Sequence, residues 1–352
     1  MTNDNGILIK NIYHMLAYAL PALVSNGYAK VQSEHFDNIH DLMAAILIIG
    51  VSRQYKRGLH KDYITVSENL STLRGQLNIV ETIRNKILSR HKLACNFDDF
   101  SENNPGNQVI KTALSILSKS KHVSTPRRHE IKKLLQPLWH INTICPTSIN
   151  WGGLLCQHHN KNSEYTMLLT LSRFVITSQL QTTVAGENKT ISIQDFTHKE
   201  LAAIYENFVL AYYKRHFPEL NPHAPRIAWD MTESTAPEYL HDMHTDIVLS
   251  NGQSTLIIDT KFYSKPLTQH YNKTILPPGN VYQIFTYVMN MAATTPNVSG
   301  MLLYAKTEDN APPAQAHTIC NHKIEIDTLD LNQDFETIKS QLNNIANTHF
   351  SN

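Results

Sequence analysis

Two aspartates and a lysine stand in a segment whose pattern predicts a β-hairpin. Residues 244–263 read HTDIVLSNGQSTLIIDTKFY, and two apolar runs flank Asn251-Gly252. An Asn-Gly pair between apolar runs is a strong signal for a hairpin with a two-residue type I′ turn. Such a hairpin brings Asp246 on its first strand close to Asp259 and Lys261 on its second. The sequence therefore predicts that two carboxylates and an ammonium group meet on one face of a sheet.

The register of this hairpin decides how the two aspartates meet. With a two-residue turn, Ser250 faces Gln253 and Asp246 faces Ile257. Facing residues lie on the same side of a sheet, as do residues two apart on one strand, so Asp246 and Asp259 become diagonal neighbours. A slip of two residues would place them directly opposite each other. Either register puts both carboxylates within reach of one hard cation.

Paired carboxylates beside a lysine are suited to metal-assisted hydrolysis of a phosphodiester. Carboxylate oxygens bind Mg²⁺, and the cation acts as a Lewis acid on the phosphoryl oxygen. Asp246 and Asp259 are the candidate metal ligands, and Lys261 would orient or deprotonate a water molecule. The alternative is a surface Asp-x-Lys pair on an edge strand, because a three-residue pattern also arises by chance.

Two helical segments supply further candidates. Glu206 stands among apolar residues before the hairpin and is a possible third metal ligand, direct or through water. The alternative is an exposed helix glutamate. After the hairpin, Gln283 and Tyr287 are four residues apart and share one helical face. They would hold the scissile phosphate or the DNA backbone, although each alone would be an ordinary helix residue.

The elements around these residues predict a mixed sheet flanked by helices, and thus a mixed α+β class. A polar loop at 182–189 marks the boundary between predicted domains 1–181 and 190–352. Apolar periodicity predicts helices at 9–20, 37–56, 107–119, 126–139, 167–181, 198–217, 279–291 and 334–346. Strands are expected within 63–83 and at 226–230, 244–249, 255–262, 299–306 and 322–327.

The charge of the 352-residue chain is unevenly distributed. Its formal net charge is +1, but residues 1–180 hold 20 Lys and Arg against 12 Asp and Glu, and residues 181–352 hold 11 against 18. Such asymmetry indicates a division of labour between the halves. Two dense basic stretches, 53–61 and 119–133, would contact phosphates or form solvated helix faces.

The four cysteines and the apolar runs indicate the cellular compartment of the protein. The cysteines are few and scattered, which fits a reducing cytoplasm. A zinc site built from Cys145, Cys156, His158 and His159 lacks the close C-x-x-C pairs of structural zinc modules. The longest apolar run, 42–51, is about half the length that spans a bilayer. With no secretory signal at the N-terminus, we expect a cytoplasmic protein without membrane contact.

The candidate site residues resemble the motifs of the PD-(D/E)xK nuclease superfamily. Asp246 matches its first acidic position, and Asp259 with Lys261 matches its second motif. Glu206 matches the glutamate of its preceding helix. Gln283-xxx-Tyr287 resembles the Q-x-x-x-Y feature of its RecB-like branch. The resemblance implies that all six named side chains, Tyr287 included, serve catalysis, with Asp246, Asp259 and Glu206 as ligands of Mg²⁺.

The chain as a whole resembles the McrC family, the nuclease subunits of McrBC modification-dependent restriction systems. The segment 11–19, NIYHMLAYA, is similar to that family's opening pattern. RGQL at 74–77 with TIR at 82–84 is similar to its GRI…TIR stretch, and segment 97–111 is similar to its FD…NxxIK stretch. These motifs occur in the same order over nearly the full length.

This resemblance implies a type IV restriction endonuclease subunit that cuts double-stranded DNA containing modified cytosine, such as 5-methylcytosine, in antiviral defence. It also implies a partner, an McrB-like AAA+ GTPase hexamer that binds GTP. The N-terminal half would dock on that ring and stimulate its GTPase. The sequence contains no Gly-Lys dipeptide and therefore no P-loop. Arg74 is a candidate partner contact, although a structural role for Gly75 would explain the same stretch.

Two other functions stay open. One is a non-catalytic adaptor that activates the AAA+ ring and uses the nuclease fold only to grip DNA. The other is a stand-alone RecB-like nuclease without a motor. The aspartates and lysine favour catalysis over gripping, and the family-like N-terminal half disfavours the stand-alone enzyme. Because the C-terminal half is acidic, we expect weak DNA binding without a partner.

Overall fold

The computed structural model describes residues 3–4, 7–24, 27–84, 91–158, 163–184, 193–231, 239–262, 268–270, 273–306 and 312–350. The chain divides into two compact units. Unit 1 comprises Met1–Ile39 together with Ala185–Asn352, and unit 2 comprises His40–Val184. Within the described ranges, no helix has the length and apolar character needed to cross a bilayer.

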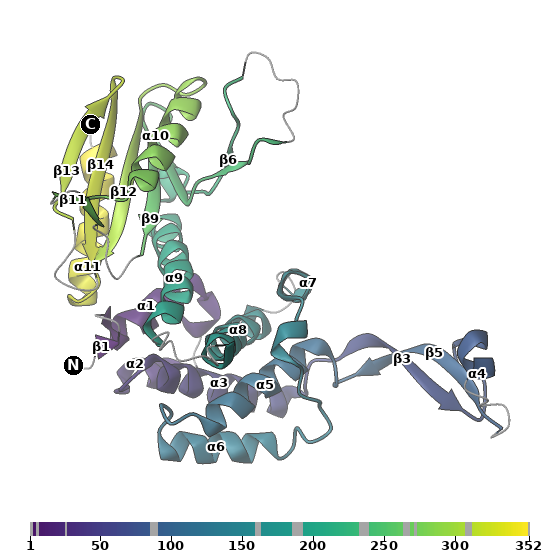
Figure 1. Ribbon diagram of the computed structural model, residues 1–352. Coiled ribbons are helices and arrows are strands. Elements are labelled where there is room, and N and C mark those ends of the chain that lie inside the picture. The colour runs from purple at the N-terminus through teal and green to yellow at the C-terminus, as the bar shows by residue number, and fades with distance from the viewer. Residues whose placement is uncertain are drawn as a thin grey trace. The chain divides into compact units, whose positions relative to one another are not determined.

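Unit 1 is built on a five-stranded mixed sheet in the order β13-β14-β12-β9-β8 (Figure 1). The three inner strands are parallel, and the two edge strands are antiparallel to their neighbours. The predicted mixed sheet is therefore confirmed. The strands are β8 (Ile247–Ser250), β9 (Thr255–Lys261), β12 (Val298–Lys306), β13 (Gln315–Ile319) and β14 (His322–Asp330). Strands β9 and β12 read as nearly continuous apolar runs because both faces of the sheet are covered.

Helix α10 (Pro278–Ala292) covers one face of this sheet. Its buried residues Ile284 and Val288 pack in one core cluster with Ile257 and Leu302. Gly300 allows the close approach, because a Cβ there would lie 2.7 Å from Val288 Cγ2 and 2.8 Å from Ile284 Cγ1. The helix is thereby held tightly against β9 and β12.

Helices α9 (Ile193–His216) and α11 (Phe335–Phe350) cover the opposite face. Buried tyrosines of α9 join the layers: Tyr213 donates a hydrogen bond to the Leu342 carbonyl (3.1 Å), and Tyr205 donates to the Leu303 carbonyl of β12 (3.5 Å). A phenolic group buried in this way needs such an acceptor. The result is a three-layer unit with the sheet in the middle.

Helix α1 (Ile9–Ala19) belongs to this unit and packs against α9. The side-chain amide of Asn11 donates to the carbonyls of Leu331 (2.9 Å) and Gln333 (2.7 Å), and His14 stacks on Phe335. The structure thus differs from the predicted division into 1–181 and 190–352, because it groups the first 39 residues with the C-terminal part. The apolar stripe of α1 is buried against a helix about 200 residues away, a distance that local sequence patterns do not report.

Unit 2 combines helices with a β arm. Its helices are α3 (Ile39–Arg57), α5 (Pro105–Lys119), α6 (Thr125–Leu135), α7 (Trp151–His158) and α8 (Ser163–Val184). Asn104 caps α5 by accepting the Asn107 N–H (3.0 Å), and both side-chain amides donate to the His60 carbonyl. Such an N-cap satisfies a backbone donor that the helix leaves unpaired.

The arm is a three-stranded sheet in the order β3-β5-β4 that extends away from these helices (Figure 1). It consists of β3 (Asp62–Leu70), β4 (Gln76–Leu77), α4 (Ile79–Arg84) and β5 (Leu93–Ser101). The alternation of residues 63–83 predicted strands throughout, but its last part forms α4. Strand β5 and helix α7 were not predicted, because neither has a clear apolar periodicity.

The remaining elements are short. In unit 1 they are β1 (Asn3–Asp4), β2 (Ile7–Leu8), η1 (Pro21–Val24), α2 (Ala29–Ser33), η4 (Pro218–Leu220), β6 (Arg226–Ile227), β7 (Met243–His244), β10 (Thr268–His270) and β11 (Lys273–Ile275). In unit 2 there is η3 (Pro146–Ser148). The strand predicted at 226–230 is thus limited to two residues.

Adding one methyl group at Gly300 should loosen α10 from the sheet. We expect Gly300→Ala to lower the free energy of unfolding by about 1–3 kcal/mol, the usual effect of overpacking a core. Chemical denaturation of the full chain measures it. Gly279→Ala is the matched control, because a Cβ there meets nothing within 4 Å. Equal stability of the two variants would show that the approach of α10 is not tight.

Candidate active site

The hairpin that carries the aspartates has a longer loop than the sequence predicted. Ser250 pairs with Thr255, and four residues, 251–254, connect the strands. The side-chain oxygen of Asn251 accepts the backbone N–H groups of Gln253 (3.0 Å) and Ser254 (2.9 Å). Of the four loop residues, all described, Gly252 alone has a positive φ. A type I′ turn needs positive φ at both central residues, so the predicted two-residue turn is wrong.

This loop shifts the register by two and brings the aspartates face to face. Ile247 pairs with Ile258, and the same register continued by one residue sets Asp246 opposite Asp259. Asp246 stands just before β8 and is therefore not part of the strand ladder. Its Oδ2 accepts both the backbone N–H and the hydroxyl of Thr260, each at 2.7 Å. The Asp246 carboxylate thus takes the place of the backbone carbonyl that would otherwise accept the Thr260 N–H.

Asp259 and Lys261 form a buried ion pair on the face of the sheet that α10 covers. Lys261 Nζ lies 2.6 Å from Asp259 Oδ2, and the Asp259 side chain is 1% exposed. Lys261 also donates to Gln283 Oε1 (2.8 Å), and Gln283 Nε2 donates to Tyr287 Oη (2.8 Å). The predicted helical pair therefore does meet the strand residues, in one continuous polar chain.

Glu206 of α9 is exposed, as in the alternative of an exposed helix glutamate, but it is electrostatically coupled to both aspartates. Partial loss of hydration, and then repulsion from Asp246 and Asp259, raises the pKa of Glu206 to about 7. Burial likewise raises the pKa of Asp259 to about 6, although Lys261 opposes this rise. Loss of hydration is thus the main cause of both raised pKa values, and repulsion between the carboxylates adds to it.

The residues present fit a divalent cation in part. Asp259 Oδ2 is buried and accepts no hydrogen bond of good geometry besides its ion pair with Lys261. Yet among the described residues no three His, Cys, Asp or Glu side chains are grouped closely enough to hold a metal. The three predicted ligands Asp246, Asp259 and Glu206 therefore do not form a closed cage. Mg²⁺ does not need one, since it keeps several waters and takes one or two carboxylates.

One contributor was missed from the sequence. The hydroxyl and the backbone N–H of Thr260 fix the Asp246 carboxylate. Threonine in a strand is common, so the sequence held no signal for this role.

Two other sequence hypotheses can be compared with the structure. Cys145 and Cys156 are exposed free thiols, and His159 lies outside the described residues. Arg74 pairs with Asp99 (3.2 Å) and lies over the Phe97 ring. Gly75 has φ +66°, and a Cβ there would lie 2.4 Å from the Asn96 carbonyl oxygen. The backbone requirement at Gly75 therefore accounts for part of this stretch.

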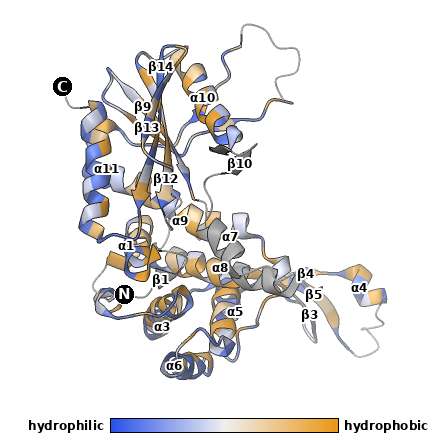
Figure 2. Cartoon of the chain, turned by 60° about the vertical axis from the view of Figure 1, so that its left-hand side comes forward, coloured by the Kyte–Doolittle hydropathy of each residue, from blue (hydrophilic) through white to orange (hydrophobic). Residues whose placement is uncertain are grey.

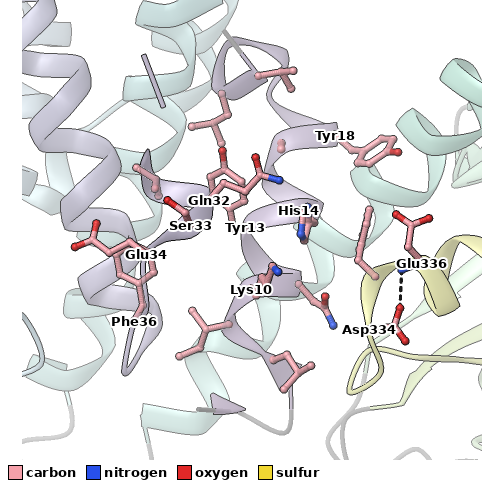
Figure 3. A pocket seen from close by; sticks show the side chains of 18 of the residues that line it. Lys10, Tyr13, His14, Tyr18, Gln32, Ser33, Glu34, Phe36, Asp334 and Glu336 are labelled. Atoms are coloured by element: carbon pink, nitrogen blue, oxygen red, sulfur yellow. Dashed lines mark hydrogen bonds between the residues drawn. The ribbon is translucent and has the colours of Figure 1, made fainter. Parts of the chain in front are cut away.

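A large cavity of about 1070 Å³ lies elsewhere in unit 1 (Figure 3). It is lined by α1, the region of α2 and the start of α11, with Lys10, His14, Tyr18, Glu34 and Glu336 among its side chains. None of the six predicted site residues lines it. This cavity is therefore separate from the candidate site.

Comparison with known proteins identifies relatives over nearly the whole chain. The model of the family "McrBC 5-methylcytosine restriction system component" matches residues 3–305. The type IV methyl-directed restriction enzyme EcoKMcrBC of Escherichia coli (strain K12) is 25% identical over 343 residues, which is 96% of either chain.

Two solved structures show weaker likeness. One is a half-complex of Thermococcus gammatolerans McrB AAA+ hexamers with bound McrC, at 13% identity and TM-score 0.44, with 95% of this chain and 76% of that chain covered. The other is the McrBC complex of the same organism, at 13% identity and TM-score 0.34, with 51% and 60% covered. With both TM-scores below 0.5, neither carries an argument about the fold.

The charge repulsion at Glu206 should appear as a pH-dependent loss of stability. A carboxyl whose pKa is raised on folding binds its proton more tightly in the folded state, so stability falls as pH rises from about 4.5 through about 7. In the presence of a chelator, we expect Glu206→Gln to raise Tm at pH 8 and to lose this advantage progressively toward pH 5. Thermal unfolding at both pH values measures it.

The exposed Glu219 of η4 provides the control variant, Glu219→Gln. The same Tm difference between Glu206→Gln and wild type at pH 8 and at pH 5 would show that Glu206 is not coupled to the aspartates.

Proposed function

This chain belongs to the McrBC 5-methylcytosine restriction system component family, and we propose that it is the subunit of such a system that cleaves DNA. Its substrate would be double-stranded DNA that contains modified cytosine, and its cofactor Mg²⁺. The observation that carries the proposal is the pair of facing aspartates with Lys261 fixed between Asp259 and Gln283. A protein that only grips DNA has no need for buried carboxylates, which repel phosphate.

The arrangement supports a PD-(D/E)xK type of site. Asp246 at the start of one strand, Asp259 and Lys261 on its antiparallel neighbour, and Gln283 on the following helix are the positions expected from that motif. The mixed sheet with helices on both faces is consistent with it. The six candidate side chains come from three elements and the residue that precedes β8, and all belong to unit 1.

The side chains have distinct roles in the proposed hydrolysis. A divalent cation bound by Asp246 and Asp259 would supply a Lewis acid at the phosphoryl oxygen. Lys261 has three N–H donors; two contact Asp259 and Gln283, and the third can orient the attacking water or a phosphate oxygen. Glu206, with a pKa of about 7, can accept the proton of that water near neutral pH.

Gln283 orients Tyr287 for phosphate binding. Because Gln283 Oε1 accepts from Lys261, its amide group must present Nε2 to Tyr287 Oη. Tyr287 Oη thus acts as an acceptor in this bond, and its own hydrogen has no acceptor among the described residues. That hydrogen would be donated to a phosphate oxygen of the substrate, an interaction strengthened by the charge on the acceptor.

A second part of the proposal is a partner, an AAA+ GTPase hexamer like the McrB that binds McrC in the Thermococcus assembly. The arm of unit 2 offers a surface for it, and Figure 2 shows hydrophobic residues on α4. Six large apolar side chains of the arm are 56–73% exposed: Tyr63, Leu73, Ile79, Val80, Ile83 and Phe100. Exposed apolar side chains clustered on one element mark a protein interface. Through this arm the chain would stimulate the GTPase.

The adaptor function keeps one observation in its favour. The carboxylates do not form a complete metal cage among the described residues. An adaptor would require the arm and the DNA-binding surface but not the carboxylate pair. Separate assays of cleavage and GTPase stimulation distinguish the two functions.

Removing either charge of the Asp259–Lys261 pair should abolish DNA cleavage and leave GTPase stimulation intact. We expect Asp259→Asn and Lys261→Ala to reduce cleavage of methylated DNA by roughly 100-fold or more, measured with the GTPase partner, GTP and Mg²⁺. Stimulation of the GTPase should be unchanged because the arm is intact. Asp242→Asn, on an exposed ion pair, is the control. Cleavage at the wild-type rate by Asp259→Asn would overturn the site assignment.

A charge on the arm should have the opposite effect. We expect Val80→Asp to abolish GTPase stimulation and complex assembly, because it places a carboxylate in a surface that would be buried. Size-exclusion chromatography with the GTPase partner and a GTP hydrolysis assay measure this. Val24→Asp, at a similarly exposed valine (58%) of unit 1, should leave both unchanged. Normal assembly of Val80→Asp would exclude the arm as the contact.

A further inference from the structure

The solvent side of α6 and the turn before it carry uncompensated positive charge. Lys119 and Lys121 stand at the end of α5 and in the following turn, and Lys132 and Lys133 stand on α6. All four side chains are exposed. In the part of the chain that the structure describes, none of them forms an ion pair with an acidic residue. Figure 2 shows α6 as a largely hydrophilic helix.

The arrangement of charge on α6 opposes helix stability. Arg128 and Lys132 are four residues apart, and like charges at this spacing repel across one helical turn. Arg127 and Arg128 lie in the first turns, where the helix dipole disfavours cations. The N-cap residue Ser124 makes no side-chain capping bond. Only Arg127 is neutralised, by the buried Asp41 of α3, which also accepts the Ser124 N–H.

Three lysines of the other unit are each paired with a carboxylate. Lys306 pairs with Asp330 (3.0 Å), Lys323 with Glu325 (2.8 Å) and Lys339 with Glu336 (2.8 Å). On α6 an acidic residue is also present, Glu130, yet it forms no ion pair among the described residues. The lysines of α6 thus stay available for an external anion. Such an anion would reduce the repulsion between Arg128 and Lys132.

The division of charge between the units identifies the kind of anion. Unit 2 holds 18 Lys and Arg against 9 Asp and Glu, whereas unit 1 holds 13 against 21. Trp139, four residues beyond the end of α6, is 80% exposed. A basic surface is typical of nucleic-acid binding, in which cations contact phosphates. The indole N–H of an exposed Trp can donate to a phosphate or sugar oxygen of a duplex.

We propose that the basic face of α6, formed by Lys119, Lys121, Lys132, Lys133 and Trp139, binds the phosphate backbone of double-stranded DNA. The contacts are with phosphates, so the surface holds DNA of any sequence and does not read its methylation. Its role is to retain the duplex while the acidic unit 1, which repels it, carries out cleavage. The inference rests on the proposed DNA substrate, but its test requires no cleavage.

Neutralising two lysines should change the salt dependence of DNA binding. Each phosphate contact contributes about 0.9 to the slope of log Kobs against log salt concentration. For the full chain and an unmethylated duplex between 50 and 200 mM KCl, we expect Lys132→Gln/Lys133→Gln to reduce this slope by about 2. Binding at low salt should weaken.

The matched control is Lys30→Gln/Lys214→Gln, which removes the same charge from exposed helical lysines of unit 1. Its slope should be that of wild type. Equal slopes in both double variants would overturn the proposal and leave only a non-local charge effect. Unchanged DNA binding with lost GTPase stimulation would also overturn it and assign the face to the protein partner. Because this test measures DNA binding and not cleavage, its failure is distinguishable from a failure of the cleavage-site assignment.

Discussion

The burial of the Asp259 carboxylate beneath α10 is the constraint on which the architecture of unit 1 depends. An ionised carboxylate removed from water is strongly unfavourable unless it is paired. Lys261 supplies the pair at 2.6 Å, and Gln283 and Tyr287 extend it into a chain of polar groups. The raised pKa of Asp259 shows that this compensation is incomplete. A site with surplus negative charge is therefore built into the sheet, and the proposed cation would compensate that charge.

The rest of unit 1 holds this chain of groups in place. The parallel pairing of β9 with β12 fixes the strand that carries Asp259, and the tight contact at Gly300 fixes the helix that carries Gln283. Asp246 comes from a different strand and is locked by two hydrogen bonds from Thr260. Because each component is rigid through packing unrelated to the chemistry, the polar groups keep their spacing without a bound ligand.

The sequence allowed the residues of the site to be predicted better than their geometry. The aspartates, Lys261 and Gln283 do come together, since alternation along a strand and helical spacing are local rules. The two-residue turn was wrong because Asn251 forms hydrogen bonds to the loop backbone, and the second of the two registers considered is the one formed. The unit boundary differed because Asn11 bonds to carbonyls about 320 residues away. Contacts of such sequence separation leave no periodic signal, and the roles of the site residues themselves stay predictions.

The charges of the two units explain why nuclease and DNA-holding surfaces would be separated in one chain. Unit 1 is acidic, and the proposed ligands of a divalent cation are among its surplus carboxylates, so it repels the polyanion that it is proposed to cut. Adding lysines around Asp259 would attract DNA, but it would also neutralise the carboxylates and displace the cation. Carrying the excess cations in unit 2, and not on the elements that hold Asp259, avoids this conflict. The nearly neutral net charge of the chain is then the sum of an acidic unit suited to a divalent cation and a basic unit suited to DNA.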